Sequence, residues 1–395
     1  NSEELREAYN EMLPKVTAFG TKALLDQKLW NQVKTFAGTE EAQSLDGQEK
    51  RLLDELVADF VEAGADLPED KRARLEELSS ELAQSTQKFS ENVLDSTNAW
   101  QKVFEDESLL AGLPESAKIA ALETAKAKEL EGWAFTLHAP SIMPIMKYLD
   151  DDSIRQEFWE ASCKVGWEGE WNNTELIRQI LELRQEKATI LGKRDYADVV
   201  LDRRMAGSGA HADKFVSDLR EKTIEAFVRE NARLVTFKAE KSGLPSDLLE
   251  PWETGYWGEK QKKEKYDFDE EEMRPYLAID PVLDGMFSLA TKIFHLRIKQ
   301  RSTSFEGKPT SLVEGNSREP VEVWHPEVKF YEVFDSQDGR HLGSFYADWH
   351  PRTDKRSGAW MNYFKMSVPG EDGSSRGPHL GLMCGNMTAP VEGKP

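Results

Sequence analysis

Histidine is the side chain that most often brings metal binding or proton transfer to an enzyme, and this sequence contains only seven. No two are four residues apart, so no helix would present two imidazoles on one face, and His-Glu-x-x-His does not occur. His341, His350 and His379 fall in a stretch with β pattern, where strand pairing could bring them together around a first-row metal. We keep that three-histidine site as an alternative and otherwise predict no metal ligand and no catalytic residue in this chain.

Other catalytic patterns are also missing from the sequence. There is no nucleophile elbow, P-loop or Rossmann glycine fingerprint, and Gly207-Ser208-Gly209 is interpreted as a break before a helix. The two cysteines, Cys163 and Cys384, are far apart and are each predicted to be small buried side chains. Their spacing argues against a disulfide framework and favours a reducing compartment, so we expect a cytoplasmic location.

The composition limits the partners. The 395 residues carry 51 basic and 72 acidic side chains, a net charge of −21, which would repel nucleic acid and anionic membranes. No apolar run approaches the roughly 18 residues of a membrane span. With 72 acidic residues, a pair of carboxylates carries no information about hydrolysis. Hydrophobic residues make up 39%, including 11 Trp, which is enough for a large buried core.

Most of the chain up to about residue 300 has helical periodicity. Apolar residues recur at three- and four-residue steps from Leu53 to Val61, and Gly64 is placed to end that helix. Trp133, Phe135 and Leu137 alternate instead and indicate a short strand or extended loop. The other helices that the pattern predicts cover about 75–93, 115–130, 153–163, 174–190, 210–241 and 281–294.

The pattern changes near residue 300. Residues 301–320 are polar and rich in Gly and Pro, which predicts a loop. Strands are predicted at 328–334, 342–349, 358–368 and 379–388, with Asp338-Gly339 as a hairpin turn. We therefore predict a mainly α protein, a large multi-helix body with a small antiparallel sheet near the C-terminus. Three regions are expected: helices in 1–150, long helices in 151–317, and the sheet in 318–395.

A set of short stretches is distinctive by its order along the chain. They are Ile190-Leu191-Gly192-Lys193-Arg194-Asp195-Tyr196-Ala197, Met205-Ala206, Tyr256-Trp257-Gly258-Glu259-Lys260-Gln261, Arg274-Pro275-Tyr276, Val323-Trp324-His325-Pro326-Glu327-Val328, Gly343-Ser344-Phe345-Tyr346-Ala347-Asp348, Lys355-Arg356-Ser357-Gly358-Ala359-Trp360-Met361, and residues 386–390. In this order and spacing they resemble the M3 family of zinc metallopeptidases, the oligopeptidase A and thimet oligopeptidase group.

The resemblance implies a fold and a reaction. The fold is a mostly helical ellipsoid split by a deep channel, with a small sheet beside the catalytic helices. The reaction is cleavage of short peptides by a zinc-bound water, with zinc held by His-Glu-x-x-His and a later Glu. Because that motif does not occur here, no catalytic residue or zinc ligand is transferred to this chain. Zinc is expected for the complete family enzyme and not for this chain alone. The family's metal-binding helix would follow Pro395, so a missing or separate C-terminal catalytic portion is an expected partner, together with short peptides.

One segment is our candidate for contact with a peptide. A strand edge beside a zinc-binding helix can pair with an extended peptide, and Gly358, Ala359, Trp360 and Met361 are the predicted groove lining. The opposing interpretation is that Trp360 is a core residue. The function predicted from the resemblance is that of an interior piece of a zinc-dependent oligopeptidase, supplying channel wall and sheet and inactive alone. The alternative is a non-catalytic helical scaffold or a peptide-binding relic of the same fold.

Overall fold

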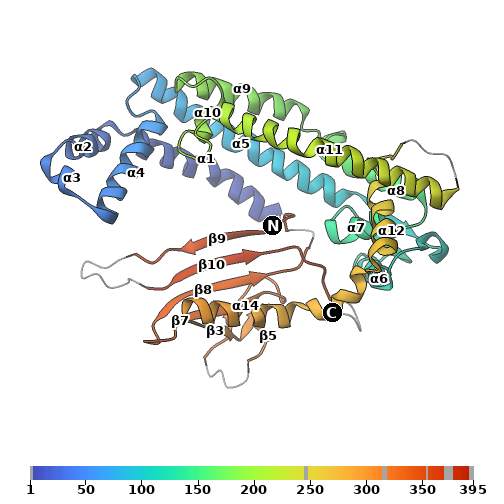
Figure 1. Ribbon diagram of the computed structural model, residues 1–395. Coiled ribbons are helices and arrows are strands. Elements are labelled where there is room, and N and C mark those ends of the chain that lie inside the picture. Colours follow the sequence, from blue (N-terminus) through green and yellow to red (C-terminus); the bar gives the residue numbers. More distant parts are fainter. Residues whose placement is uncertain (1–2, 244–247, 314–317, 353–354, 369–376, 391–395) are drawn as a thin grey trace. The chain divides into compact units, whose positions relative to one another are not determined.

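The chain forms two compact units, each built from two separate segments (Figure 1). The computed structural model describes residues 3–243, 248–313, 318–352, 355–368 and 377–390. Unit 1 comprises Asn1–Ala99 and Cys163–Thr236, and unit 2 comprises Trp100–Ser162 and Phe237–Pro395. The sequence predicted three regions instead, 1–150, 151–317 and 318–395. Those regions were defined by the type of secondary structure and not by compactness, so the division into two units does not test them and they stay a prediction.

Unit 1 is helical in its described part. Its principal core lies between α1, α5 and α9, where Leu25, Leu78 and Leu183 are buried. A smaller core stacks Trp30 on Phe60, with ring centroids 5.3 Å apart. The helices are α1 (Glu3–Leu25), α2 (Gln27–Ala37), α3 (Glu40–Ser44), α4 (Gly47–Ala63), α5 (Glu69–Ala99), α9 (Thr174–Ile190), α10 (Tyr196–Leu201) and most of α11 (Gly209–Ser242), with a 3₁₀ turn at Gly169–Trp171.

Local signals in the sequence set these helix ends. Gly64 follows α4 with φ of +91°, a left-handed conformation that closes the last turn and that a side chain would strain. Asp195 accepts a hydrogen bond from the Asp198 amide and caps α10. The predicted helices at 53–61, 75–93, 174–190 and 210–241 are confirmed as α4, α5, α9 and α11.

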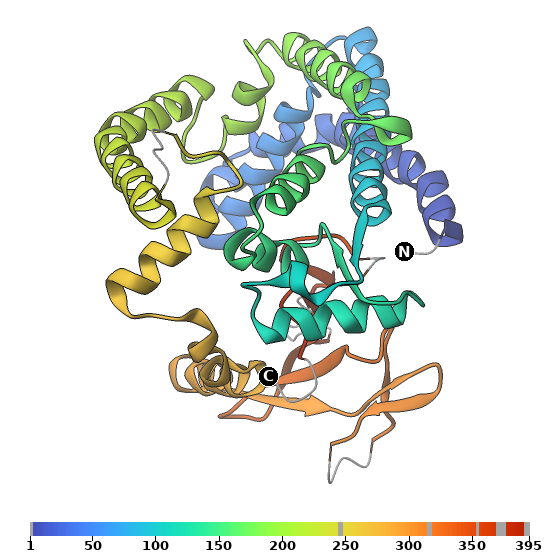
Figure 2. The same cartoon turned by 90° about the vertical axis from the view of Figure 1, so that its right-hand side faces the viewer.

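The first part of unit 2 is a helical layer with a two-stranded ribbon. Phe104, Phe135 and Phe158 meet edge to face in its core, with centroids 5.8 and 6.3 Å apart. The ribbon strand at 133–136 confirms the predicted short strand. The elements are β1 (Gln101–Phe104), α6 (Glu115–Ala127), β2 (Trp133–Thr136), α7 (Ala139–Tyr148), α8 (Asp152–Cys163) and, later in the chain, α12 (Thr254–Tyr266), α13 (Glu270–Met273) and α14 (Ile279–Phe294), with 3₁₀ turns at Glu107–Leu110 and Arg274–Leu277. Figure 2 shows α12, α13 and α14 as separate helical pieces joined by short connections.

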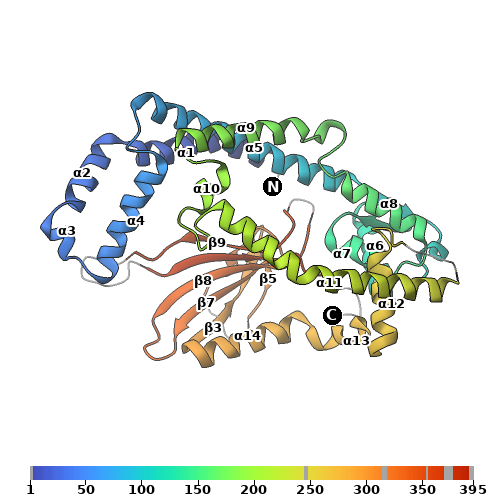
Figure 3. The same ribbon diagram turned by 45° about the horizontal axis from the view of Figure 1, so that its top comes forward.

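A five-stranded sheet forms the second part of unit 2, in the order β3-β7-β8-β10-β9 (Figure 3). One face is covered by α14, whose Phe287 ring contacts Tyr331 and Phe345. Tyr346 lies on the opposite face beside Phe330 and Phe364. The strands are β3 (Leu296–Arg301), β7 (Lys329–Asp335), β8 (His341–Asp348), β9 (Trp360–Lys365) and β10 (His379–Cys384). A separate three-stranded sheet contains β4 (Thr303–Phe305), β5 (Lys308–Ser311) and β6 (Val321–Glu322).

The predicted class, mainly helical with a small sheet near the C-terminus, is confirmed, but two details differ. Strand β10 pairs parallel to β8, from His379 opposite Gly343 to Cys384 opposite Asp348, so the sheet is mixed and not wholly antiparallel. The helix predicted at 281–294 ends at Phe294 as expected, where His295 adopts a left-handed φ of +53°, but the next residues form strand β3, which was not predicted and which pairs with β7.

Two further predictions were wrong. The polar stretch 301–320, predicted as a loop, contains β4 and β5, whose turn is made by Glu306 and Gly307, both with positive φ. Cys163 is exposed. It lies five residues beyond the buried Phe158, which turns it about 140° away from the face of α8 that packs into the core. Cys384 is buried as predicted. Within the described residues, no helix is long and apolar enough to cross a membrane.

Candidate functional site

The predicted groove residues lie at an open edge of the five-stranded sheet. Gly358 and Ala359 precede β9, while Trp360 and Met361 are its first two residues. Strand β9 pairs with β10 on one side, and no described strand pairs with its other side. Because successive side chains of a strand point to opposite faces, the high exposure of Tyr363 (71%) and Phe364 (57%) means that both faces of this edge are accessible.

The turn before β9 is fixed by a side chain from the segment after β10. Asn386 donates its amide hydrogens to the backbone oxygens of Arg356, at 3.1 Å, and Gly358, at 2.6 Å. Gly358 has a φ of +89°, which a residue with a side chain adopts only with strain. The Arg356 guanidinium lies 4.5 Å from the centroid of the Trp360 ring. Trp360 is half-buried, so it is neither a core residue nor a free surface one.

A buried charge cluster supports the same turn from the end of β8. Asp348 is only 3% exposed and accepts two hydrogen bonds from Arg352, both 2.8 Å, and one from Trp324 Nε1, 3.0 Å. Lys355, also buried, donates to the Asp348 carboxylate (2.8 Å), the Asp348 carbonyl (2.9 Å) and the His350 carbonyl (2.8 Å). The cluster therefore ties the chain ahead of Gly358 to the end of β8.

The titration of Asp348 reflects these contacts. Burial alone would raise the pKa of its carboxyl, but the donors of Arg352, Lys355 and Trp324 outweigh burial and lower that pKa to about 2. Asp348 is therefore ionised throughout the physiological range and serves as a fixed anchor, not as a proton donor.

The three-histidine metal site proposed from the sequence is wrong. His341 begins the eight-residue strand β8 and His350 lies two residues beyond its end, so the strand alone, at ~3.3 Å per residue, places about 23 Å between His341 and Asp348. Each ring has another partner: Ser344 Oγ lies 2.9 Å from His341, Glu327 lies 3.2 Å from His350, and the Ser367 amide donates to His379 at 3.0 Å.

The described residues do not fit a zinc site. Among them, no group of three or more His, Cys, Asp and Glu side chains is close enough to hold a metal ion. The acidic run from Asp269 is used in ion pairs instead, with Glu270 bound to Lys147 at 2.9 Å and to Lys262 at 2.7 Å. No catalytic step is therefore derived through a metal in this chain.

The predicted groove residues lie beside and on an edge strand, and their role as a groove lining stays a prediction. The residues that hold this edge were missed. Asp348, Lys355 and Asn386 all lie in the stretches that carried the family resemblance, yet no role was assigned to them. One signal was present in the sequence: Asp348 lies near the end of a predicted strand and is followed closely by Arg352 and Lys355. This arrangement of one acid and two bases could have indicated an ion-pair cluster at the end of that strand. Asn386 gave no comparable signal, since its partners are backbone oxygens from a different strand connection.

Comparison with known proteins gives consistent matches. The model of the family described as "Peptidase family M3" matches residues 145–395. Oligopeptidase A of Escherichia coli is 34% identical over 400 residues, covering 100% of this chain and 56% of that protein. The probable cytosolic oligopeptidase A of Arabidopsis thaliana is 33% identical over 403 residues, covering 99% of this chain and 55% of that protein. Dipeptidyl carboxypeptidase of Salmonella typhimurium is 28% identical over 399 residues, covering 100% and 55%. The chain thus spans about half the length of these relatives.

Proposed function

Because this chain belongs to peptidase family M3, as its ordered motifs predicted, we propose that it is part of a zinc-dependent oligopeptidase that hydrolyses short peptides. Its share of that function is to hold the substrate, while the zinc ligands lie in residues outside this sequence. The names of the relatives support the substrate class. The absence of His-Glu-x-x-His from the sequence supports the division of roles.

The observation that carries the proposal is the open edge of β9. An extended peptide can continue a sheet by exchanging backbone hydrogen bonds with such an edge. This kind of binding depends more on the length and extended conformation of the peptide than on the identity of its side chains. Met361 and Tyr363 are each 71% exposed and lie on one face of the edge, where they can contact alternate side chains of the peptide. A broad preference for short, extended peptides follows.

Rigid support for the edge matters to this role. Asn386 and Lys355 fix the backbone that leads into β9, so its donors and acceptors are aligned before a peptide arrives. Pre-organisation of this kind lowers the entropy that binding must overcome. The relevant residues act on the position of the strand and touch no reacting atom.

Backbone-methylated peptides test this mode directly. A short peptide is titrated into the 395-residue chain, alongside two versions that are N-methylated at alternate residues in opposite registers. Methylation removes the donors that face β9 in one register only, so we expect one methylated peptide to bind about tenfold or more weakly and the other to bind as well as the parent. Hydrogen exchange should show slowed amides in β9 with the binding peptides.

Matched glycine variants locate the site. Gly358 and Gly339 both have positive φ, +89° and +76°, and an added Cβ meets no atom within 4 Å at either one. Gly358→Ala and Gly339→Ala therefore impose similar strain at opposite ends of the sheet, but only Gly358→Ala should weaken peptide binding. Equal binding by all three peptides, or equal effects of the two glycine variants, would reject the edge as the site. If no peptide binds while the chain is folded, the helical-scaffold alternative is favoured.

A further inference from the structure

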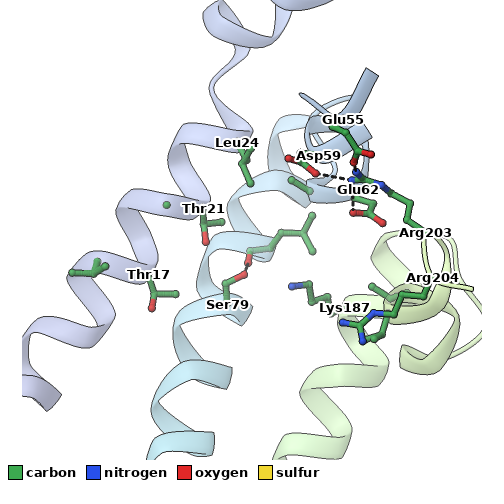
Figure 4. Close-up of a pocket in the computed structure, with 16 residues that line it drawn as sticks. Thr17, Thr21, Leu24, Glu55, Asp59, Glu62, Ser79, Lys187, Arg203 and Arg204 are labelled. Atoms are coloured by element: carbon green, nitrogen blue, oxygen red, sulfur yellow. Dashed lines mark hydrogen bonds and ion pairs between the residues drawn. The ribbon is translucent and has the colours of Figure 1, made fainter. Parts of the chain in front are cut away.

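Unit 1 contains a cavity of about 800 Å³ that the peptide-binding proposal does not use. It is lined by α1, α4, α5, α9, α10 and the segment after α10. Figure 4 shows hydroxyl side chains of α1 and α5 on one side and basic side chains of α9 and the later segment on the other. A volume of this size suits a small organic molecule.

Lys187 of α9 is a cation without a counter-charge in this cavity. Its side chain is half-buried and points into the cavity (Figure 4). Burial lowers the pKa of its ammonium group, and no described charge or hydrogen-bond acceptor offsets that effect. The neighbouring carboxylate, Glu186, is bound instead to Arg74, at 2.7 and 2.9 Å. Holding an uncompensated cation away from water is costly, which suggests that an anion completes the site.

The carboxylates that line the same cavity do not supply that anion. Glu55, Asp59 and Glu62 of α4 all contact Arg203, with Asp59 at 2.6 Å and Glu62 at 3.1 Å. They are therefore committed to one guanidinium. The adjacent Arg204 also lines the cavity, and its side chain has no ion pair with any described residue.

Hydroxyl groups complete the set of donors. Thr17 and Thr21 of α1 line the cavity, and neither hydroxyl is engaged by another described side chain. Ser79 donates its hydroxyl hydrogen to the Leu75 carbonyl at 2.8 Å. The cavity is thus lined by one ammonium group, one guanidinium group and two hydroxyl groups that no other described side chain engages. All of these groups can donate hydrogen bonds, which is what an oxyanion requires of its binding site.

We propose that this cavity binds a small organic anion whose carboxylate or phosphate group is held by Lys187 and Arg204. The rest of such a molecule would occupy the remaining volume beside Val16, Leu24 and Val200. This inference rests on unit 1 alone and does not depend on the proposed peptidase function.

Three probes distinguish the sources of the anionic group. N-acetyl-dialanine offers a carboxylate, glycerol 2-phosphate offers a phosphate, and N-acetyl-dialanine amide is the uncharged control. Each is titrated into the 395-residue chain at low ionic strength by calorimetry. We expect saturable binding of at least one anionic probe and none of the amide. The probe that binds identifies the class, and binding of both supports a general oxyanion site.

Variants assign the binding to the cavity. Lys187→Met and Arg204→Met should each weaken it by about tenfold or more, since each removes a charge-assisted hydrogen bond. Lys88→Met, which removes an exposed lysine from α5 outside the cavity, should leave it unchanged. Lys187→Met should also be at least as heat-stable as the parent, because it removes an unpaired half-buried charge. Failure of both anionic probes to bind, equal binding by Lys187→Met and Lys88→Met, or a lower melting temperature of Lys187→Met would overturn the proposal.

Discussion

Replacing Asp348 by Asn should loosen the sheet that carries the candidate edge. The substitution keeps the size of the side chain and removes its charge. Lys355, whose side chain is 3% exposed, and Arg352 would then lose their common counter-ion. Lys355 cannot move its ammonium to water without giving up its bonds to the backbone oxygens of Asp348 and His350.

Two estimates set the size of the effect. A carboxyl whose pKa falls from 3.8 to about 2 on folding contributes roughly 2.4 kcal/mol to stability at neutral pH. Because the side chain is 4% exposed, solvent screening reduces this little. Removing one partner of a buried ion pair costs about 3–5 kcal/mol, since the other charge is left uncompensated. We therefore expect Asp348→Asn to lower the opening free energy of β7 and β8 by about 3 kcal/mol.

The pH dependence has a defined sign. The folded pKa of Asp348 lies below its unfolded value, so its stabilisation is fully present above about pH 4 and is lost as the pH falls toward 2. The parent and Asp348→Asn should therefore differ most at neutral pH and converge in acid.

Hydrogen exchange of the β7 and β8 amides is the suitable assay, because a chain with two compact units need not unfold in one step. The control is Asp218→Asn on α11, which makes the same change in an exposed ion pair with Lys214 and should alter stability by less than about 0.5 kcal/mol. The double variant Asp348→Asn/Lys355→Met should recover part of the loss. A change below 1 kcal/mol at neutral pH, or no recovery in the double variant, would refute the reasoning.

Three further outcomes are expected. Gly112→Ala should destabilise unit 2 by about 2 kcal/mol or more in thermal unfolding, because the new Cβ would lie 2.2 Å from the Tyr148 carbonyl oxygen at a φ of +90°; Gly258→Ala, in α12 with no atom within 4 Å, should be neutral or slightly stabilising, and equal effects would contradict the steric argument. The stability advantage of Lys187→Met over the parent should shrink as the pH rises toward the ordinary lysine pKa of 10.5, since the parent's half-buried ammonium then loses its charge. If the advantage instead grows with pH, the buried charge of Lys187 is not its cause. Chelator-washed, metal-replete chain should retain no stoichiometric zinc by elemental analysis, and one zinc per chain would show that a site was missed.

Local sequence signals were sufficient for most helices. The end of α4 at Gly64 and the length of α11 follow from periodicity and a glycine with positive φ, which act within a few residues. The same signals could not predict that none of the described side chains of α11 would be buried, because burial depends on what packs against a helix.

Pairing between distant segments was harder to predict. Strand β3 was missed because it begins directly after α14 and only its pairing with β7 establishes that it is extended. The parallel pairing of β10 with β8 depends on where the chain returns to the sheet, which no local pattern encodes. The anchors of the candidate edge belong to this class, since Asn386 meets Gly358 only once β9 and β10 are paired.

The interleaving of the two units constrains the order of folding during synthesis. The core of unit 1 joins Leu75 and Leu78 of α5 to Ile180 and Leu183 of α9, and the whole first segment of unit 2 is translated between them. Residues 1–99 therefore leave the ribosome with an apolar face of α5 that α1 covers only in part until α9 follows. Such a chain spends part of its synthesis exposed to aggregation, and cutting it between the units cannot release either one as a single continuous segment.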